Sequence, residues 1–121
     1  MGKARILVVD DAKFSRELLK LHLSNAGYEV ETAEDAIDAG RRVLRDPPHL
    51  IITDVNMPYL SGTEFIAALR ADDEVPDIPV IFLSADESKD GEERRLRAAA
   101  WLRKPVSAER LLEVVALQVP M

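Results

Sequence analysis

The sequence of 121 residues contains no cysteine. This absence excludes disulfide frameworks, zinc sites with thiolate ligands and cysteine nucleophiles, and it fits a reducing compartment. Aromatic residues make up only 5% of the chain, and no apolar run approaches the roughly 20 residues that span a bilayer. The start, Met1 to Arg5, leads directly into a strand-like segment instead of a signal sequence, so we expect a cytoplasmic protein without membrane insertion.

Positive charge is also scarce, because 16 Lys and Arg stand against 22 Asp and Glu, a formal net charge of −6. A sequence-independent grip on phosphate backbones needs clustered cations, so we expect no direct nucleic-acid binding. Hydrophobic residues make up 47% of the chain, which argues against disorder and predicts one domain over residues 1–121. No repeat or Gly/Ser linker divides the sequence, so we expect any output domain to lie on another chain.

Short apolar runs alternate with longer amphipathic segments, which is typical of βα units around a parallel sheet. The five expected strands cover residues 5–9, 28–32, 50–52, 80–83 and 99–102. The first three helices are expected from Asp11 to a stop at Gly27, over 36–44 before Pro47 and Pro48, and over 63–71. A fourth helix within 86–97 would be short and solvated, and the fifth is expected from a cap at Ser107 to a stop at Pro120.

Proline, glycine and histidine add local information to this pattern. Pro58 and Gly62 favour a loop after the third strand. His22 and His49 are far apart in sequence and fit no metal or catalytic motif, so we interpret both as surface or boundary residues.

Polar residues follow four of the expected strands. They are Asp10 and Asp11 after the first, Asp54 after the third, Ser84 after the fourth and Lys104 after the fifth. In an open α/β sheet, ligands collect beyond the carboxyl ends of the strands, so these side chains are expected to converge. Neighbouring carboxylates repel one another unless a cation lies among them, and oxygen-only ligands favour Mg²⁺, for which Mn²⁺ would substitute.

A carboxylate in such a cluster can attack a phosphoryl group, provided that metal, ammonium and hydrogen-bond donors neutralise the charge. Asp54 is the most central candidate nucleophile, and Asp10 and Asp11 are candidate metal ligands. Lys104 would pair with one phosphoryl oxygen and Ser84 would donate to another. Each residue alone also has a local explanation, such as Asp11 capping the first helix. The prediction of phosphoryl transfer therefore depends on the convergence of all five residues, not on any one of them.

Four separate motifs resemble those of bacterial response-regulator receiver domains: RILVVDD from Arg5, IITDVNMPYLSG from Ile51, VIFLSA from Val80, and Lys104 with Pro105. The resemblance covers nearly the whole chain and implies a flavodoxin-like, doubly wound sheet of five parallel strands, order 2-1-3-4-5, with five helices. It implies that Asp54 is the phosphoacceptor, that Asp11, Asp54 and the backbone carbonyl of Asn56 bind Mg²⁺, and that Asp10 acts mostly through a bound water. The implied phosphodonor is a sensor histidine kinase or a histidine phosphotransfer protein.

The resemblance also implies a switch. The peptide bond before Pro105 is usually cis in the family and aims Lys104 into the pocket. The hydroxyl at the Ser84 position is coupled to an aromatic residue three positions before the lysine, here Trp101, which turns inward on phosphorylation. Asn56 and Asp86 stand where receivers control the access of water to the acyl phosphate, and this polar and acidic pair indicates fairly rapid loss of phosphate.

Three features depart from the family pattern. Trp101 stands where Tyr or Phe is usual, so its bulk would limit the inward rotamer, or it is simply a core aromatic at the edge of a strand. The stretch from Arg97 reads Arg-Ala-Ala-Ala where a glycine is frequent, and the segment between Ser84 and Lys104 is about two residues shorter than usual. These changes affect the helix 4, strand 5 and helix 5 face, through which a homodimer could form, and not the phosphorylation chemistry.

We favour a phosphorylatable signalling module of a two-component or phosphorelay system, which is a phosphoacceptor and not an enzyme acting on other substrates. A pseudo-receiver, which binds proteins without turning over phosphate, is the main alternative. A phosphatase of the haloacid-dehalogenase type would carry a second Asp two residues after a nucleophile on the first strand, and a lid. A flavin carrier would not place two aspartates in its first loop. The cognate kinase and the downstream partner are not assigned by the sequence.

Overall fold

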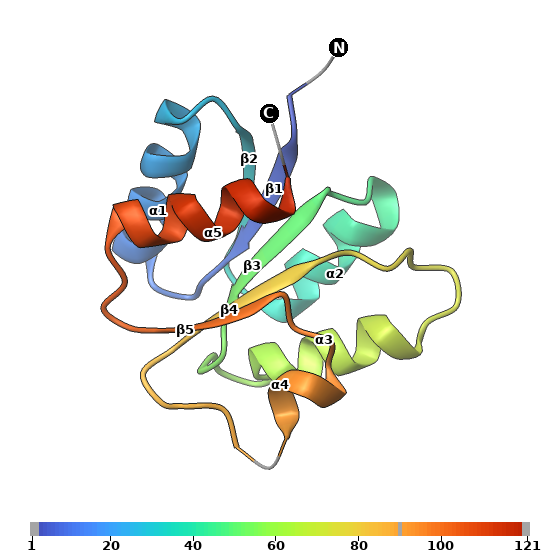
Figure 1. Ribbon diagram of the computed structural model, residues 1–121. Helices are drawn as coiled ribbons and strands as arrows, with labels where there is room; N and C mark the ends of the chain where they lie inside the picture. The colour runs from blue at the N-terminus through green and yellow to red at the C-terminus, as the bar shows by residue number, and fades with distance from the viewer. Residues whose placement is uncertain (1–2, 90, 120–121) are drawn as a thin grey trace.

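Strands and helices alternate along the chain in the computed structural model, which describes residues 3–89 and 91–119 (Figure 1). The strands are β1 (Arg5–Val9), β2 (Glu29–Ala33), β3 (Leu50–Asp54), β4 (Val80–Ser84) and β5 (Ala100–Arg103). The helices are α1 (Lys13–Asn25), α2 (Ala36–Arg45), α3 (Gly62–Ala71), α4 (Glu92–Arg95) and α5 (Ala108–Gln118).

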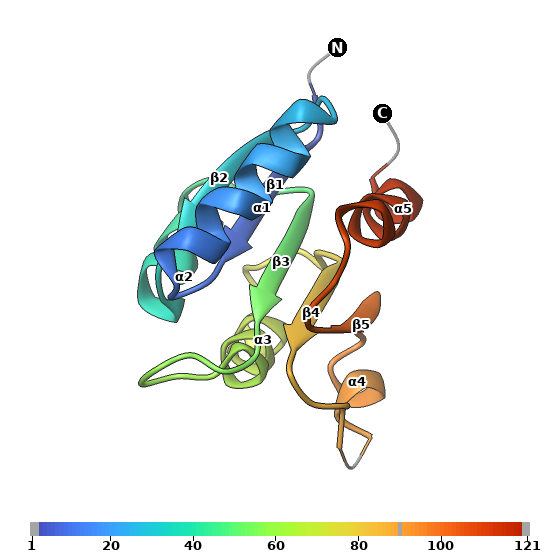
Figure 2. The same ribbon diagram turned by 90° about the vertical axis from the view of Figure 1, so that its left-hand side faces the viewer.

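The strands form one sheet of order β2-β1-β3-β4-β5, in which every neighbouring pair is parallel. Helices α1 and α5 cover one face, and α2, α3 and α4 cover the other (Figures 1 and 2). The predicted doubly wound fold is therefore confirmed. The chain runs from β1 to one edge of the sheet and returns past β1 to β3, so the carboxyl ends of β1 and β3 form the switch point where such folds bind ligands.

Two hydrophobic cores fill the space between the sheet and its helices. Alternate residues of β1 serve different cores: Ile6 and Val8 pack on the side of α1 and α5, whereas Leu7 and Val9 pack on the side of α2 and α3. All five residues of β3 and of β4 are buried. These two strands read as continuous apolar runs because both of their faces are covered.

Strand β1 has its predicted bounds, and β3 and β4 extend beyond theirs by two residues and one residue, to Asp54 and Ser84, whereas both edge strands are displaced by one residue. Tyr28 is buried, yet it belongs to the turn after α1, where its N–H donates to the carbonyl oxygen of Leu23 at 3.2 Å. Strand β2 therefore starts at Glu29, which pairs with Arg5 of β1. Strand β5 starts at Ala100, opposite Ile81.

The helix ends follow their capping residues. Ser107 caps α5 as predicted, because its hydroxyl accepts from the N–H of Arg110 at 3.1 Å. Pro120, the predicted stop of this helix, lies outside the described residues. The predicted loop after β3 is present, but it ends at Ser61: this residue forms a capping box with Glu64, and α3 begins at Gly62, one residue earlier than predicted.

The apolar spacing of α1 predicted the helix correctly, but it did not show which side faces the sheet. Leu23 is buried, whereas Phe14, Leu18 and Leu21 are 69%, 42% and 54% exposed. These three residues follow a spacing of four and three, so they form a second stripe on the solvent side. Periodicity identifies a helix, and tertiary packing decides which stripe is covered.

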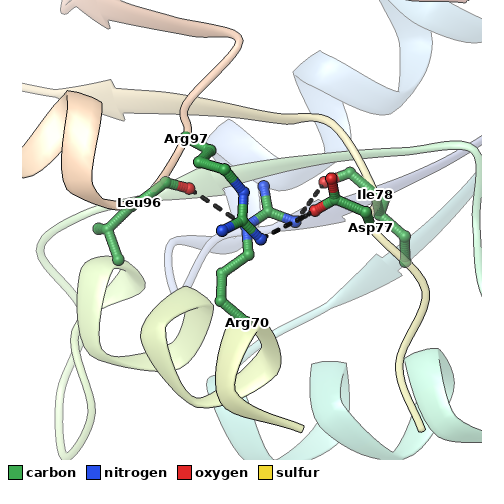
Figure 3. A network of polar contacts seen from close by, with 5 residues as sticks. All are labelled: Arg70, Asp77, Ile78, Leu96 and Arg97. Atoms are coloured by element: carbon green, nitrogen blue, oxygen red, sulfur yellow. Dashed lines mark hydrogen bonds and ion pairs between the residues drawn. The ribbon is translucent and has the colours of Figure 1, made fainter. Parts of the chain in front are cut away.

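Helix α4 has four residues and buries none of them, as expected for a short solvated helix. Its end is anchored from α3 (Figure 3). The guanidinium of Arg70 donates to the carbonyl oxygens of Leu96 at 3.1 Å and Ile78 at 2.8 Å, and it pairs with Asp77 at 3.1 Å. Arg97, in the left-handed region at φ 54°, donates to the same carboxylate oxygen at 3.1 Å.

Both histidines lie where the sequence predicted. His49 is exposed, and its Nδ1 accepts from the backbone N–H of Arg5 at 2.9 Å, while His22 is partly buried on α1. Within residues 3–89 and 91–119, no helix combines the length and the apolar character that crossing a membrane requires.

Candidate functional site

The register of the sheet brings the predicted site residues to one edge. Val9 of β1 lies opposite Thr53 of β3, so the next residues, Asp10 and Asp54, continue side by side at the carboxyl ends of the two strands. Ser84 ends β4 opposite Arg103 of β5. Lys104 follows directly and donates its backbone N–H to the carbonyl oxygen of Ser84 at 2.8 Å.

Three carboxylates form the centre of the site. One oxygen from each of Asp10, Asp11 and Asp54 lies within 4.8 Å of the others. Asp10 and Asp54 are 1% and 6% exposed, whereas Asp11 is exposed. Asp11 does not cap the first helix: the N-cap residue is Ala12, and the N–H of Ala12 donates to Oδ1 of Asp10 at 2.9 Å.

The surroundings of Asp54 act on the pKa of its carboxyl in opposite directions. Burial raises the pKa of its carboxyl above the ordinary value, and the negative charge of Asp10 raises this pKa further. The ammonium of Lys104, whose Nζ is 3.2 Å from Oδ1, and the backbone N–H of Asn56 favour the ionised form and lower the pKa, but burial is the largest of these effects. The carboxylate is thus held by a cation and an amide donor in a largely dry site.

Lys104 reaches this pocket from the loop after β5. The peptide bond between Lys104 and Pro105 is cis, as the resemblance implies. Ser84, on the neighbouring strand, is 1% exposed, and its Oγ accepts from the backbone N–H of Asp86 at 3.0 Å. The hydroxyl hydrogen of Ser84 is not used by this bond, since the oxygen is the acceptor.

Trp101 is a partly buried aromatic on the edge strand β5. Its ring lies 5.2 Å, centroid to centroid, from the ring of Phe82, its partner in the register with β4. Its indole N–H donates to the backbone carbonyl of Asp86 at 2.9 Å. Asp86 is therefore hydrogen-bonded to Ser84 through its N–H and to Trp101 through its carbonyl oxygen.

Two residues that support the site were not recognised from the sequence. A Cβ atom at Gly62 would stand 2.1 Å from the backbone oxygen of Asp54, so the close approach of α3 to the end of β3 requires glycine. Ser15 donates its hydroxyl to Oδ2 of Asp10. The signals were weak: a glycine directly after a capping serine, and a serine one helical turn beyond the aspartate pair.

The donor set fits a hard divalent cation. Every candidate ligand is an oxygen, and by formal charge three carboxylates beside one ammonium leave an excess of two negative charges. Carboxylates without histidine or thiolate suit Mg²⁺ or Mn²⁺. The acidic cluster is therefore compatible with the predicted magnesium site.

Comparison with known proteins identifies the family. The response regulator receiver domain family matches residues 6–116. The response regulator MprA of Mycobacterium leprae (strain TN) is 41% identical over 110 residues, which cover 89% of this chain and 47% of that protein. The chain thus spans about half the length of the curated relatives it matches.

Solved structures agree with the sequence comparison. The chemotaxis response regulator CheY4 of Vibrio cholerae has 35% sequence identity and a TM-score of 0.89, with 98% of this chain and 100% of that chain covered. A response regulator receiver protein from Pseudomonas putida has 31% identity and a TM-score of 0.86, with 97% and 98% covered. The fold, the convergent strand ends and these matches lead to one conclusion: the chain belongs to the response regulator receiver domains of two-component systems.

Proposed function

We propose that Asp54 is the phosphoacceptor of this receiver domain. The observation that carries the proposal is its setting: a buried carboxylate at the switch point, with Lys104 Nζ at 3.2 Å and two further carboxylates close by. Receiver domains of response regulators are phosphorylated by histidine kinases. The donor for this chain is accordingly a sensor histidine kinase or a histidine phosphotransfer protein.

The transfer is a displacement at phosphorus. An oxygen of the ionised Asp54 forms the new O–P bond while the P–N bond to the donor histidine breaks, and the electron pair of that bond returns to the imidazole. An ionised carboxylate needs no general base. Lys104 pairs with one phosphoryl oxygen, and the free hydroxyl hydrogen of Ser84 is donated to another.

The acidic cluster would hold the cation on which this transfer depends. Asp11, Asp54 and the backbone carbonyl of Asn56 are the direct ligands in this proposal, and Asp10 acts mostly through a bound water. When bound, Mg²⁺ supplies positive charge beside the phosphoryl oxygens, and Mn²⁺ substitutes for it. By holding this cation, Asp10 and Asp11 would reduce the repulsion between their own negative charges and the incoming phosphoryl group.

The phosphorylated domain acts as a signal, and it catalyses only its own phosphorylation and dephosphorylation. A phosphoryl group adds roughly two negative charges to the pocket. Asn56 and Asp86, at the two positions that control the access of water in receivers, are both polar and exposed, so the expected phosphoryl lifetime is short. A lifetime of many hours would contradict this part of the proposal.

Ser84 and Trp101 form the switch in this proposal. Support comes from the two hydrogen bonds of Asp86, which connect the Ser84 hydroxyl oxygen to the indole of Trp101. When Ser84 turns toward a phosphoryl oxygen, the bond from the N–H of Asp86 is lost, and the loop that Trp101 holds is released. Trp101 is the chain's one tryptophan, so its fluorescence reports this step directly.

The readout surface is the face formed by α4, β5 and α5, used either by a downstream protein or by a second copy of the chain. All 121 residues form one receiver domain in this proposal. Sedimentation velocity with and without a phosphoryl donor tests the homodimer, for which a donor-dependent increase in mass is expected. An unchanged monomer would favour the downstream protein as the partner.

The test of the phosphoacceptor is intact-mass spectrometry after incubation with Mg²⁺ and acetyl phosphate. Wild type gains one phosphoryl increment, and the gain disappears in Asp54→Asn and in the presence of a chelator. Asp73→Asn, which changes an exposed aspartate away from the pocket, is the matched control and behaves as wild type. A protein that gains no increment and binds no Mg²⁺ would instead be a pseudo-receiver that signals by constitutive contact.

A further inference from the structure

Asp10 has a partner for each of its polar groups. It is 1% exposed, and its backbone N–H donates to the carbonyl oxygen of Ala33 at 3.1 Å. Its carbonyl oxygen accepts from Arg16 Nη1 at 2.8 Å. Its carboxylate accepts from the N–H of Ala12 at Oδ1 and from the hydroxyl of Ser15 at Oδ2, at 2.9 Å and 2.5 Å. The first turn of α1 therefore encloses this aspartate.

Ser15 is, among the described residues, the one side chain that donates to this carboxylate. The hydroxyl lies in the first turn of α1 and is partly buried. A hydrogen bond to an ionised acceptor is shorter and stronger than one between neutral groups. Because Ala12 and Ser15 hold different oxygens, the plane of the Asp10 carboxylate is fixed by two points.

Asp11 offers a contrast within the same cluster. Its side chain is exposed, and across residues 3–89 and 91–119 no hydrogen bond or ion pair reaches its carboxylate. Asp11 can therefore turn to meet a cation, whereas Asp10 cannot turn without breaking its bonds. The orientation of Asp10 is set in advance by the helix that follows it.

We propose that Ser15 is a positioning residue of the cation site, a role that rests on the proposed function of the acidic cluster. Its hydroxyl holds the buried Asp10 carboxylate in its orientation toward Asp11 and Asp54. Partners of ligating carboxylates orient the ligands, and removal of one such partner typically weakens metal binding about 10- to 100-fold. Ser15 acts through Asp10 and contacts no substrate.

The first experiment measures Mg²⁺ binding by isothermal titration calorimetry without any phosphoryl donor. Ser15→Ala is expected to weaken binding by about tenfold, the lower end for such a partner because the Ala12 bond remains. Ser15→Thr keeps the hydroxyl and is expected to bind within about twofold of wild type. Ser24→Ala, an exposed serine at the far end of the same helix, controls for the helix-favouring effect of alanine.

The second experiment separates positioning from folding. With acetyl phosphate as donor, the Mg²⁺ concentration for half-maximal phosphorylation of Ser15→Ala should rise by the same factor as the dissociation constant. The rate at saturating Mg²⁺ should stay within about twofold of wild type. A merely structural role would lower the melting temperature and the maximal rate together, and that result would overturn the proposal.

Three other results would overturn the positioning role of Ser15. Equal Mg²⁺ affinity in Ser15→Ala and wild type would overturn the positioning role and leave the proposed function intact. Equal weakness of Ser15→Thr and Ser15→Ala would overturn it as well, because the hydroxyl would then not be responsible. A wild-type protein that binds no Mg²⁺ and accepts no phosphoryl group would instead refute the proposed function itself, and with it the role of Ser15.

Discussion

The contact between Gly62 and the end of β3 makes a sharp prediction about Gly62→Ala. A Cβ atom at this position would stand 2.1 Å from the backbone oxygen of Asp54, 3.0 Å from its carbonyl carbon and 3.1 Å from the Cα of Val55. All three atoms belong to the backbone, so no side chain can rotate out of the way. The carbonyl oxygen of Asp54 also accepts from the hydroxyl of Thr53 at 3.0 Å, which resists its displacement.

The magnitude follows from this geometry. Carbon and oxygen need a separation roughly 1 Å larger, so α3 and the end of β3 must move apart, and overpacking of this kind costs about 3 kcal/mol. Alanine returns about 0.5 to 1 kcal/mol through its lower backbone entropy. The net destabilisation is therefore about 2 to 2.5 kcal/mol, or a fall of about 10 °C in melting temperature for a domain of this size.

The assay is urea denaturation followed by far-ultraviolet circular dichroism, with Gly40→Ala as the matched control. Gly40 lies inside α2, and a Cβ there meets no atom within 4 Å. This control should gain about 0.5 to 1 kcal/mol from helix propensity alone. If Gly62→Ala is as stable as wild type, the close approach of α3 to Asp54 does not require glycine and the reasoning fails.

Three further perturbations test other parts of the structure. Burial raises the pKa of Asp54, so ionisation of this carboxyl is less favourable in the native state than in the unfolded state. In a chelator, Asp54→Asn should therefore be more stable than wild type at pH 7, and this advantage should disappear as the pH falls through the raised pKa to below the ordinary value of 3.8. Equal stability at pH 7 in thermal melts would contradict that direction. Arg70→Met should lower the free energy of unfolding by about 2 to 3 kcal/mol, because two carbonyl oxygens lose a donor from a side chain that is 12% exposed. Arg97→Met changes a side chain that is 59% exposed and should cost under about 1 kcal/mol. Equal losses in urea titrations would refute the anchoring of α4 by Arg70. Ser61→Ala should cost about 1 kcal/mol by removing the capping box of α3, and an unchanged urea midpoint would show that the box is not needed.

The order of the elements and their kind were predictable because the inner strands are covered on both faces. Continuous apolar runs at residues 50–52 and 80–83 identify such strands without any knowledge of their neighbours. The edge strands were placed one residue early because their limits depend on pairing. Glu29 enters β2 through its partner Arg5, a relation that no local pattern contains.

The site was predictable for a topological reason, since parallel strands place their carboxyl ends at one edge. The convergence of Asp10, Asp54 and Lys104 follows from this rule and from the order of the motifs. The supporting contacts could not be predicted in the same way. The bond from Ser15 to Asp10 depends on the entry angle of α1, and an isolated serine in a helix carries no signal of its own.

The anchoring of α4 and the exposure of α1 were also beyond the sequence. Arg70 reaches Leu96 across 26 positions of the chain, so its role appears only once α3 and α4 are neighbours. The apolar residues Phe14 and Leu21 fit the helical spacing, yet both face solvent. In each case a residue type fits two environments, and the tertiary contacts choose between them.

The most direct test of Asp54 as the phosphoacceptor is chemical trapping of the acyl phosphate. The protein is incubated with Mg²⁺ and acetyl phosphate, reduced with sodium borohydride, which converts an aspartyl phosphate to homoserine, and mapped by peptide mass spectrometry. Homoserine at position 54, absent without Mg²⁺ and absent in Asp54→Asn, is the expected result. Homoserine at Asp10 or Asp11, or at no position in a protein that binds Mg²⁺, would contradict the assignment.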